Sequence, residues 1–276
     1  MPLFSATRLK SFALLSLAAV LPSLPAMAEV VEYKVDYKDG ETTLQAHVAK
    51  DDALEENRPG VLICHAWWGQ GGYARHRARM LAEMGYVAVV LDMYGKGVYT
   101  DDAEQAGKLA SHFYNNREQF RTRAKAGLEV LKAQPGVDPQ RIAVIGYCFG
   151  GTTALELAYA GADVAGIVSF HGSLLPPIAD SDDAKNIKTK VLICHGQADP
   201  FFSNEKLMGV IGPLQKANVP TSTILYSQAM HAFTDPTMDG SLEGAIYQAR
   251  ADRQSWAHMQ IFFEEIFAQD GDGDGE

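Results

Sequence analysis

Three things that this 276-residue chain lacks narrow its function before any motif is considered. It has 24 basic against 34 acidic residues, so it lacks the basic excess that nucleic acids and anionic membrane surfaces require of a partner. It has no internal repeat and no linker-like segment, which predicts one domain after the N-terminal residues. It has only three cysteines, an odd number, so at least one thiol must stay free.

Charge is also missing from most of the N-terminal segment. Two basic residues precede an uncharged run at 11–28 that ends in Ala-Met-Ala, which predicts an export signal cleaved after Ala28. Its apolar core, 12–21, is shorter than the ~20 residues that a membrane-spanning helix needs. No cysteine follows the cleavage point, which argues against a lipoprotein anchor. We therefore expect a secreted or periplasmic protein that begins at Glu29 and carries a net charge of −12.

The rest of the chain has the pattern of an α/β protein. Residues 30–50 alternate apolar and polar side chains around Asp39-Gly40, which predicts an antiparallel hairpin. Short apolar runs then alternate with helical patterns, which predicts a mostly parallel sheet with helices on both faces. These runs are 60–67, 86–95, 141–148, 164–172, 190–199 and 221–233. The predicted domain spans 29–269, and the acid-glycine repeat at 270–276 predicts a disordered tail.

Two of the three cysteines each end a strand-like run. Cys64 and Cys194 are expected to be buried, and if their strands are adjacent a disulfide between them is an open possibility. The charged stretch at 115–125 is expected to be the solvated face of a helix.

The third cysteine stands in a different pattern. Cys148 lies in Gly-Tyr-Cys-Phe-Gly, between an apolar strand and a helical segment, and this matches the nucleophile elbow with sulfur in place of oxygen. The glycines suit a strained turn, and the helix that begins there offers free N–H groups to a thiolate and an oxyanion. A buried cysteine before a glycine turn is the alternative reading of the motif alone.

The order of the downstream residues favours the nucleophile. Asp199 and His231 each follow a predicted strand, in the order nucleophile, acid, histidine. His231 would pair with the Cys148 thiol, and Asp199 would fix the tautomer of the imidazole. His195 and His65 compete as the base, but no acid follows His195 in the required order.

The remaining strand ends suggest supporting roles. His65 opens the loop His-Ala-Trp-Trp-Gly, where such enzymes place an oxyanion donor, so the backbone N–H groups of Trp67 and Phe149 are the predicted oxyanion hole. Three aromatic side chains are predicted for the substrate pocket: Trp68, Tyr147 and Phe233. His171 and Asp92 are expected to position loops.

These motifs together resemble the dienelactone hydrolase (carboxymethylenebutenolidase) family. The resemblance rests on GYCFGG, HAWWG, LDMYG, HGQAD and MHAF, and it runs from about Glu32 to Phe267. It implies an α/β-hydrolase with a Cys-His-Asp triad, no metal and no cofactor. It also implies a small-molecule ester or lactone as the substrate, and we expect a monomer.

The sequence departs from the family pattern where the substrate would bind. The best-known members carry a glutamate at the place of Ala66 and two arginines near the places of Ala103 and Asp235. Without those cations a buried carboxylate on the substrate would have no partner, so we expect a neutral ester or lactone. Two other functions stay open: a redox protein that uses the Cys148 thiol, and a non-catalytic binding protein that retains the pocket.

Overall fold

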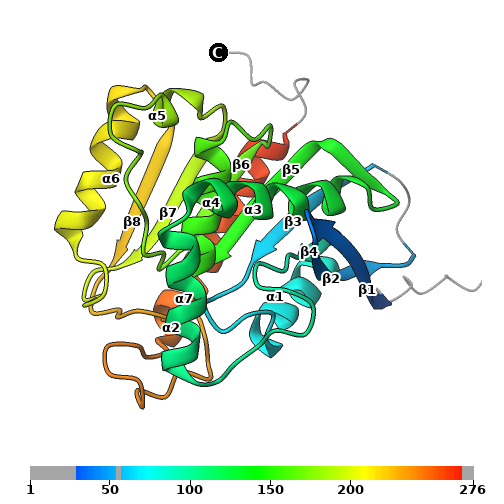
Figure 1. Cartoon of the computed structure of the whole chain (residues 1–276), viewed down its shortest axis with the longest axis horizontal. Coiled ribbons are helices and arrows are strands. Elements are labelled where there is room, and N and C mark those ends of the chain that lie inside the picture. The colour runs from blue at the N-terminus through cyan, green and yellow to red at the C-terminus, as the bar shows by residue number, and fades with distance from the viewer. Residues whose placement is uncertain (1–28, 54–56, 269–276) are drawn as a thin grey trace, which may run out of the picture.

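The computed structural model describes residues 29–53 and 57–268, and one eight-stranded sheet runs through their centre (Figure 1). The strand order is β1-β2-β4-β3-β5-β6-β7-β8. The strands are β1 (Val30–Asp39), β2 (Thr42–Asp51), β3 (Arg58–Cys64), β4 (Val87–Val90), β5 (Val137–Tyr147), β6 (Gly166–Phe170), β7 (Lys190–Gly196) and β8 (Thr221–Tyr226). The helices are α1 (Gly72–Glu83), α2 (Ala103–Tyr114), α3 (Arg117–Lys132), α4 (Phe149–Tyr159), α5 (Asp183–Asn186), α6 (Asn204–Lys216) and α7 (Ala249–Phe267).

The predicted mixed sheet is confirmed. Strands β3 to β8 pair in parallel, whereas β1 pairs antiparallel with β2, and β2 pairs antiparallel with β4. Gly40 has a φ of +56° in the turn between β1 and β2, a left-handed conformation that glycine adopts without a steric cost. The sequence pattern therefore gave both the hairpin and the parallel part of the sheet.

Helices cover both faces of the sheet, as predicted. Buried residues of α2, α3, α4 and α6 form one apolar cluster, and buried residues of α1 and α7 form another on the opposite face. The inner strands β4 and β6 are buried at every position because helices cover them on both sides. This burial fixes the strand ends, and therefore the loops that follow them.

Cys64 and Cys194 are both buried, as expected, but their strands are not adjacent. Cys64 lies on β3 and Cys194 on β7, with β5 and β6 between them. All three cysteines are free thiols. The possibility of a disulfide between Cys64 and Cys194 was therefore wrong, because chain order does not give the order of strands in a doubly wound sheet.

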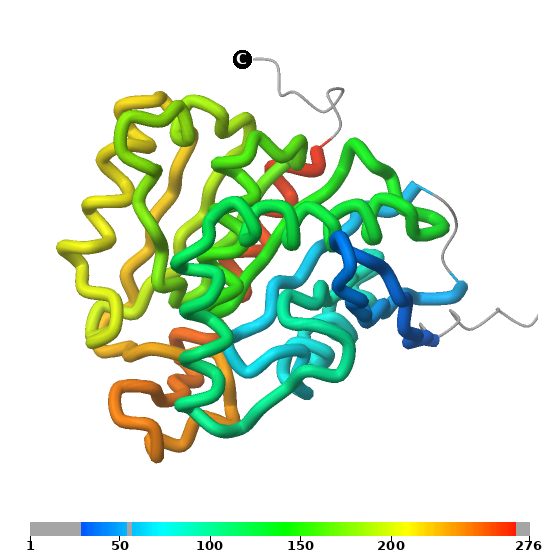
Figure 2. The backbone as a smooth tube through the Cα atoms, viewed as in Figure 1, coloured from blue at the N-terminus to red at the C-terminus, as the bar shows by residue number. Residues whose placement is uncertain are grey.

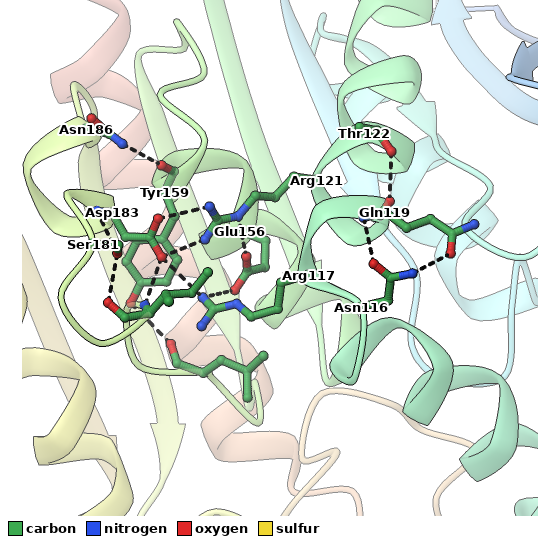
Figure 3. A network of polar contacts seen from close by, with 12 residues as sticks. Asn116, Arg117, Gln119, Arg121, Thr122, Glu156, Tyr159, Ser181, Asp183 and Asn186 are labelled. Atoms are coloured by element: carbon green, nitrogen blue, oxygen red, sulfur yellow. Dashed lines mark hydrogen bonds and ion pairs between the residues drawn. The ribbon is translucent and has the colours of Figure 1, made fainter.

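The expectation of a solvated helix face at 115–125 was wrong for its arginines. A break at Asn115 and Asn116 separates α2 from α3, and the side chain of Asn116 accepts a hydrogen bond from the backbone of Gln119. Arg121 donates to both oxygens of Asp183, at 2.9 and 2.7 Å, and its Nε donates to Glu156 at 2.8 Å (Figure 3). The arginines of this stretch are therefore buried or half-buried, and Arg117 and Arg121 join α3 to α4 and α5, whereas Glu118, Thr122 and Lys125 are exposed.

Two predicted segments lie outside the described residues. These are the export signal at 1–28 and the acidic tail at 270–276, and both stay predictions. Within 29–53 and 57–268, no helix has the length and apolar character needed to cross a membrane.

Candidate active site

Cys148 lies at the sharp turn between β5 and α4. Its backbone has φ +55° and ψ −116°, a region that residues other than glycine rarely adopt. A Cβ at Gly146 would lie 1.9 Å from the carbonyl oxygen of Gly150, and one at Gly150 would lie 2.0 Å from that of Cys64. Both positions therefore require glycine, and the turn leaves Cys148 partly exposed.

Asp199 and His231 meet beside this turn. Asp199 follows β7 and His231 follows β8, so both lie at the carboxyl edge of the parallel strands. The Nδ1 of His231 lies 2.7 Å from Oδ2 of Asp199. The other oxygen, Oδ1, accepts the backbone N–H groups of Phe201 and Phe202 at 2.9 and 3.1 Å. The carboxylate is therefore held on one side by backbone and on the other by the imidazole.

The charges at this site favour a protonated histidine. Burial by itself lowers the pKa of His231, but the neighbouring Cys148 side chain and the hydrogen bond with Asp199 outweigh it and raise this pKa to about 10. A His231 imidazolium next to Cys148 is the arrangement that stabilises a thiolate.

Trp67 and Phe149, whose N–H groups are the predicted oxyanion donors, line the same cavity as Cys148 and His231. Within residues 29–53 and 57–268, neither the N–H of Trp67 nor that of Phe149 donates to another group. The loop carrying Trp67 is held by the Tyr94 hydroxyl, which donates to the Trp67 carbonyl oxygen at 3.0 Å. These two N–H groups are therefore free to donate hydrogen bonds to a ligand oxygen.

His65 and His195 form hydrogen bonds to backbone groups of the neighbouring loops. The Nε2 of His65 accepts the backbone N–H of Met93 at 3.2 Å, so its Nδ1 donates to the Ala66 carbonyl oxygen at 2.7 Å. Burial lowers the pKa of His65, which is consistent with this neutral tautomer. The Nε2 of His195 lies 2.8 Å from the carbonyl oxygen of Phe202.

Asp92 and His171 were both expected to position loops, and both form hydrogen bonds to loop groups. Asp92 positions its loop as expected, because its oxygens accept the backbone N–H groups of Gln45, Tyr94 and Gly95. The Nε2 of His171 lies 2.8 Å from the Thr234 hydroxyl in the loop after β8, and its ring also lines the cavity, with its centroid 5.3 Å from that of His231. Burial and the adjacent His231 hold the pKa of His171 well below its usual range, so this ring is neutral.

The side chain of Cys148 faces an inner cavity of about 240 Å³. Cys148 and His231 line it together with Trp68 and Tyr147, two of the three predicted pocket aromatics. Phe233 does not: it is fully buried and packs against His171 and Tyr226. That prediction was wrong because Ala232 has a φ of +55°, which turns the chain after His231 toward the core.

The sequence reasoning missed several lining residues. Tyr73, Tyr114 and Phe201 come from α1, α2 and the loop after β7, which are far apart along the chain. Their only shared signal in the sequence is a position at or near an element end on the carboxyl side of the sheet.

An outer groove of about 520 Å³ adjoins the inner cavity and carries acidic groups. The segment near residue 240 and the segment near residue 100 converge at the lower edge of the molecule (Figure 2), and both line this groove. Asp101, Asp235 and Asp239 contribute carboxylates, whereas none of the described lysines or arginines lines it. Ala66 and Ala103 also face this groove.

No metal site accompanies these groups. In the part of the chain that the structure describes, no three His, Cys, Asp or Glu side chains come together in a way that could hold a metal ion.

Comparison with known proteins places the chain in a family. A family model described as the dienelactone hydrolase family matches residues 44–267. The crystal structure of a dienelactone hydrolase-like promiscuous phosphotriesterase from metagenomic libraries is 38% identical, covers 87% of this chain and 99% of its own, and superimposes with a TM-score of 0.83. Protein usf of Aquifex pyrophilus is 29% identical over 212 residues, which are 75% of this chain and 88% of its own.

A further relative is named for its enzymatic activity. The carboxymethylenebutenolidase of Rhodococcus opacus is 28% identical over 204 residues, which are 71% of this chain and 77% of its own. The chain therefore belongs to the dienelactone hydrolase family and is a hydrolase with the α/β-hydrolase fold.

Proposed function

We propose that this protein is an exported cysteine hydrolase that cleaves a neutral ester or lactone through a thioester intermediate. The observation that carries the proposal is the hydrogen-bonded pair of His231 and Asp199 beside Cys148, in one cavity at a strained strand-to-helix turn. Nucleophile, base and orienting acid are then in the order and arrangement of an acyl-transfer site.

In the proposed mechanism the Cys148 thiolate attacks the acyl carbon. The carbonyl electrons move onto the oxygen, which accepts hydrogen bonds from the N–H groups of Trp67 and Phe149. When the tetrahedral intermediate collapses, the imidazolium of His231 gives its proton to the leaving alkoxide, and a thioester remains. His231 then takes a proton from water as the water attacks the thioester, which releases the acid and restores the pair.

The groove supports a neutral substrate. Asp235 is 8% exposed and its Oδ1 accepts from the backbone and side chain of Thr237, so this carboxylate is fixed at the groove. A substrate carboxylate beside it would meet a like charge, and no lysine or arginine among the described residues lines the groove to offset it. One related protein of known structure is described as a promiscuous phosphotriesterase. Phosphotriesters carry no charge, which agrees with a neutral substrate for this protein.

Export is a separate part of the proposal and rests on residues 1–28 alone. N-terminal sequencing of the protein recovered from outside the cytoplasm is expected to begin at Glu29. An N-terminus that begins before residue 11 would contradict cleavage.

A panel of paired substrates tests the reaction. Each neutral aryl ester or lactone is assayed beside its carboxylate-bearing analogue with the wild type, Cys148→Ala and His231→Ala. We expect turnover of the neutral member only, reduced by about 10³-fold or more in both variants. Ester hydrolysis that is unchanged in Cys148→Ala would overturn the proposal. Peroxide consumption that requires Cys148, without ester turnover, would favour a redox function instead.

Asp235→Asn tests the substrate class within the same panel. The asparagine oxygen can still accept from Thr237, so the loop is preserved while the charge is removed. We expect kcat/KM for the carboxylate-bearing substrates to rise by about tenfold relative to the neutral ones. An unchanged ratio would show that this carboxylate does not select the substrate.

A further inference from the structure

The segment that carries His231 is fastened to helix α1 by a buried chain of hydrogen bonds. Arg77 of α1 is 4% exposed, and its guanidinium pairs with Asp252 of α7. Its Nη2 also donates to the carbonyl oxygen of Thr234 at 3.0 Å, and its Nε donates to the hydroxyl oxygen of Tyr73 at 3.1 Å. Because Thr234 lies three residues after His231, these contacts tie the loop of the proposed base to two helices.

The chain of hydrogen bonds continues from α1 to His171, which directly follows β6. The Tyr73 hydroxyl donates to Oγ1 of Thr234 at 2.7 Å, and this Oγ1 lies 2.8 Å from Nε2 of His171. Thr234 is 1% exposed, and it is not among the described residues that line either cavity. Its hydroxyl therefore links Tyr73 and His171 at a place that a substrate does not reach.

The donors in this chain can point in only one direction. A guanidinium has no acceptor, so the Tyr73 oxygen accepts from Arg77 and the Tyr73 proton goes to Thr234. The Thr234 hydroxyl has one proton of its own, and Nε2 of His171 is the acceptor left for it among the described residues. Nε2 of His171 then carries no proton, and the neutral ring holds its proton on Nδ1.

Within residues 29–53 and 57–268, Thr234 is the single hydrogen-bond anchor of the His171 ring, because Nδ1 of His171 is buried without a partner. This ring packs edge-on against His231, with the centroids 5.3 Å apart and the planes at 64°. The ring of Phe201 also packs edge-on against His231, at 5.2 Å. His231 is thus in contact with two rings, and its Nδ1 is held by Asp199.

A positive charge on His171 would oppose the imidazolium of His231. Two charged rings 5.3 Å apart in a buried place would repel each other, whereas the hydrogen bond that Nε2 accepts favours the neutral form of His171. Burial is the largest cause that holds the pKa of His171 well below its usual range, and His231, His195 and Arg77 add to it. The other titratable groups around the two rings are Tyr147 of β5, Cys148 before α4, Asp199 after β7 and Asp235 after β8.

We propose that Thr234 and His171 are positioning residues for His231. The chain from α1 fixes His171 in its neutral Nδ1–H tautomer, and that ring holds the imidazole of His231 toward Cys148. These roles rest on the proposed function for the identity of the reacting pair, and they can be tested with or without ester turnover.

Three threonine variants separate this role from a merely structural one. Thr234→Val removes the hydroxyl and nearly keeps the shape of the side chain, whereas Thr234→Ser keeps the hydroxyl. Thr189→Val is the matched control: Thr189 is 3% exposed and lies just before β7, at the edge of the sheet opposite the site. Tyr73 is left unchanged because it lines both cavities.

Proton–nitrogen correlation NMR spectra of the histidine rings measure the tautomer directly. The His171 signals are assigned by their absence from His171→Asn, since asparagine tolerates the φ of +42° at this position. We expect the Nδ1–H form of His171 from about pH 6 to 9 in the wild type and in Thr234→Ser. In Thr234→Val the Nε2–H form should appear, because the donor to Nε2 is gone. An Nε2–H or a doubly protonated His171 in the wild type would overturn the proposal.

The rate at which iodoacetamide alkylates Cys148 reports on the reacting pair without any ester. We expect the rate constant at pH 8 to fall about fivefold in Thr234→Val, to be largely restored in Thr234→Ser, and to stay within about twofold in Thr189→Val. Cys64 and Cys194 are buried, so the mass of the intact protein reports the reaction at Cys148. An unchanged rate in Thr234→Val would overturn the proposal, whether or not esters are hydrolysed.

Steady-state kinetics with a neutral ester separate positioning from substrate binding. We expect kcat to fall about tenfold in Thr234→Val, with KM within about twofold, and to recover in Thr234→Ser. In the His171→Asn background, Thr234→Val should lower kcat by less than about twofold, because Thr234 acts through His171.

Equal losses of kcat in the two backgrounds, or a change in KM alone, would contradict the positioning role. If neither the wild type nor any variant hydrolyses esters, while the tautomer and the alkylation rates are as expected, the hydrolase proposal fails and the positioning role stands.

Discussion

At the scale of single residues, the three thiols differ because their surroundings differ. Burial raises the pKa of the Cys194 thiol to about 12, and it also raises the pKa of the Cys64 thiol, so both are protonated and unreactive at neutral pH. Cys148 is instead partly exposed at a strained turn and lies next to His231. The same residue type therefore serves as core in two places and as the candidate nucleophile in the third.

His231 should make the stability of the fold depend on alkaline pH. Its pKa of about 10 lies above the ordinary value of about 6.5, so the folded state holds this proton more tightly than the unfolded state. The stabilisation is complete below about pH 6.5 and is lost as the pH rises through about 10. We expect the difference in the free energy of unfolding between the wild type and His231→Gln to shrink over that window in urea titrations. A difference that stays constant from pH 6 to 10.5 would contradict the raised pKa.

Asp199→Asn tests the role of the acid. The asparagine oxygen can still accept the backbone N–H groups of Phe201 and Phe202, but the fixed negative charge beside Nδ1 of His231 is gone. We expect kcat for a neutral ester to fall by about 10²- to 10⁴-fold with little change in KM. A change in KM alone would mean that Asp199 shapes the pocket and does not orient the imidazole.

The residues of the candidate site were predictable to different degrees. Cys148, Asp199 and His231 could be found because each follows a strand in a fixed chain order. Phe233 was misplaced because the positive φ of Ala232 is not visible in the sequence. Tyr114 was missed because the sequence does not show which side of α2 faces the cavity.

At the scale of elements, the turn between β5 and α4 depends on close contact with β3. Gly150→Ala would place a Cβ 2.0 Å from the backbone oxygen of Cys64, and backbone at this position cannot move aside. We expect this variant to lose most soluble expression or to unfold far below the temperature of the wild type. Gly209→Ala is the matched change in α6, where a Cβ meets no atom within 4 Å, and it should stabilise the protein by about 0.5–1 kcal/mol. Equal thermal midpoints for the two variants would contradict this packing.

The buried ion network between α3, α4 and α5 shows what local patterns leave out. An arginine-rich helix is predicted to be exposed to solvent unless its acidic partners are known. The partners of Arg121 are Glu156 and Asp183, which lie 35 and 62 residues further along the chain. Glu156 is fully buried and contacts both Arg117 and Arg121 (Figure 3).

Glu156→Gln should therefore destabilise the protein strongly. Removing the charge leaves two arginines short of a partner in a poorly solvated place, which costs about 3–5 kcal/mol in the free energy of unfolding. Lys185→Gln removes an exposed ion pair with Asp182 and should change the same quantity by less than about 1 kcal/mol. Chemical unfolding of both variants measures the difference, and similar losses would contradict the buried network.

At the scale of the whole molecule, the sheet brings distant parts of the sequence to one edge. The alternation of apolar runs with helical patterns was sufficient for a mostly parallel sheet with a hairpin, and the structure confirms it. The pattern could not give the strand order, and the strands that carry Cys64 and Cys194 are in fact separated by β5 and β6. The loops at the carboxyl edge then combine a thiol, a histidine and an acid with a groove whose charge is negative.

The central claim is that Cys148 carries the acyl group during turnover. An excess of the wild-type enzyme is mixed with a neutral p-nitrophenyl ester, and the reaction is quenched in acid within the first turnover. The protein is then digested for mass spectrometry. We predict that the peptide containing Cys148 gains the mass of the acyl group, and that the peptides containing Cys64 and Cys194 do not. Full turnover by the wild type with no acyl adduct on Cys148, together with unchanged turnover by Cys148→Ala, would contradict the account.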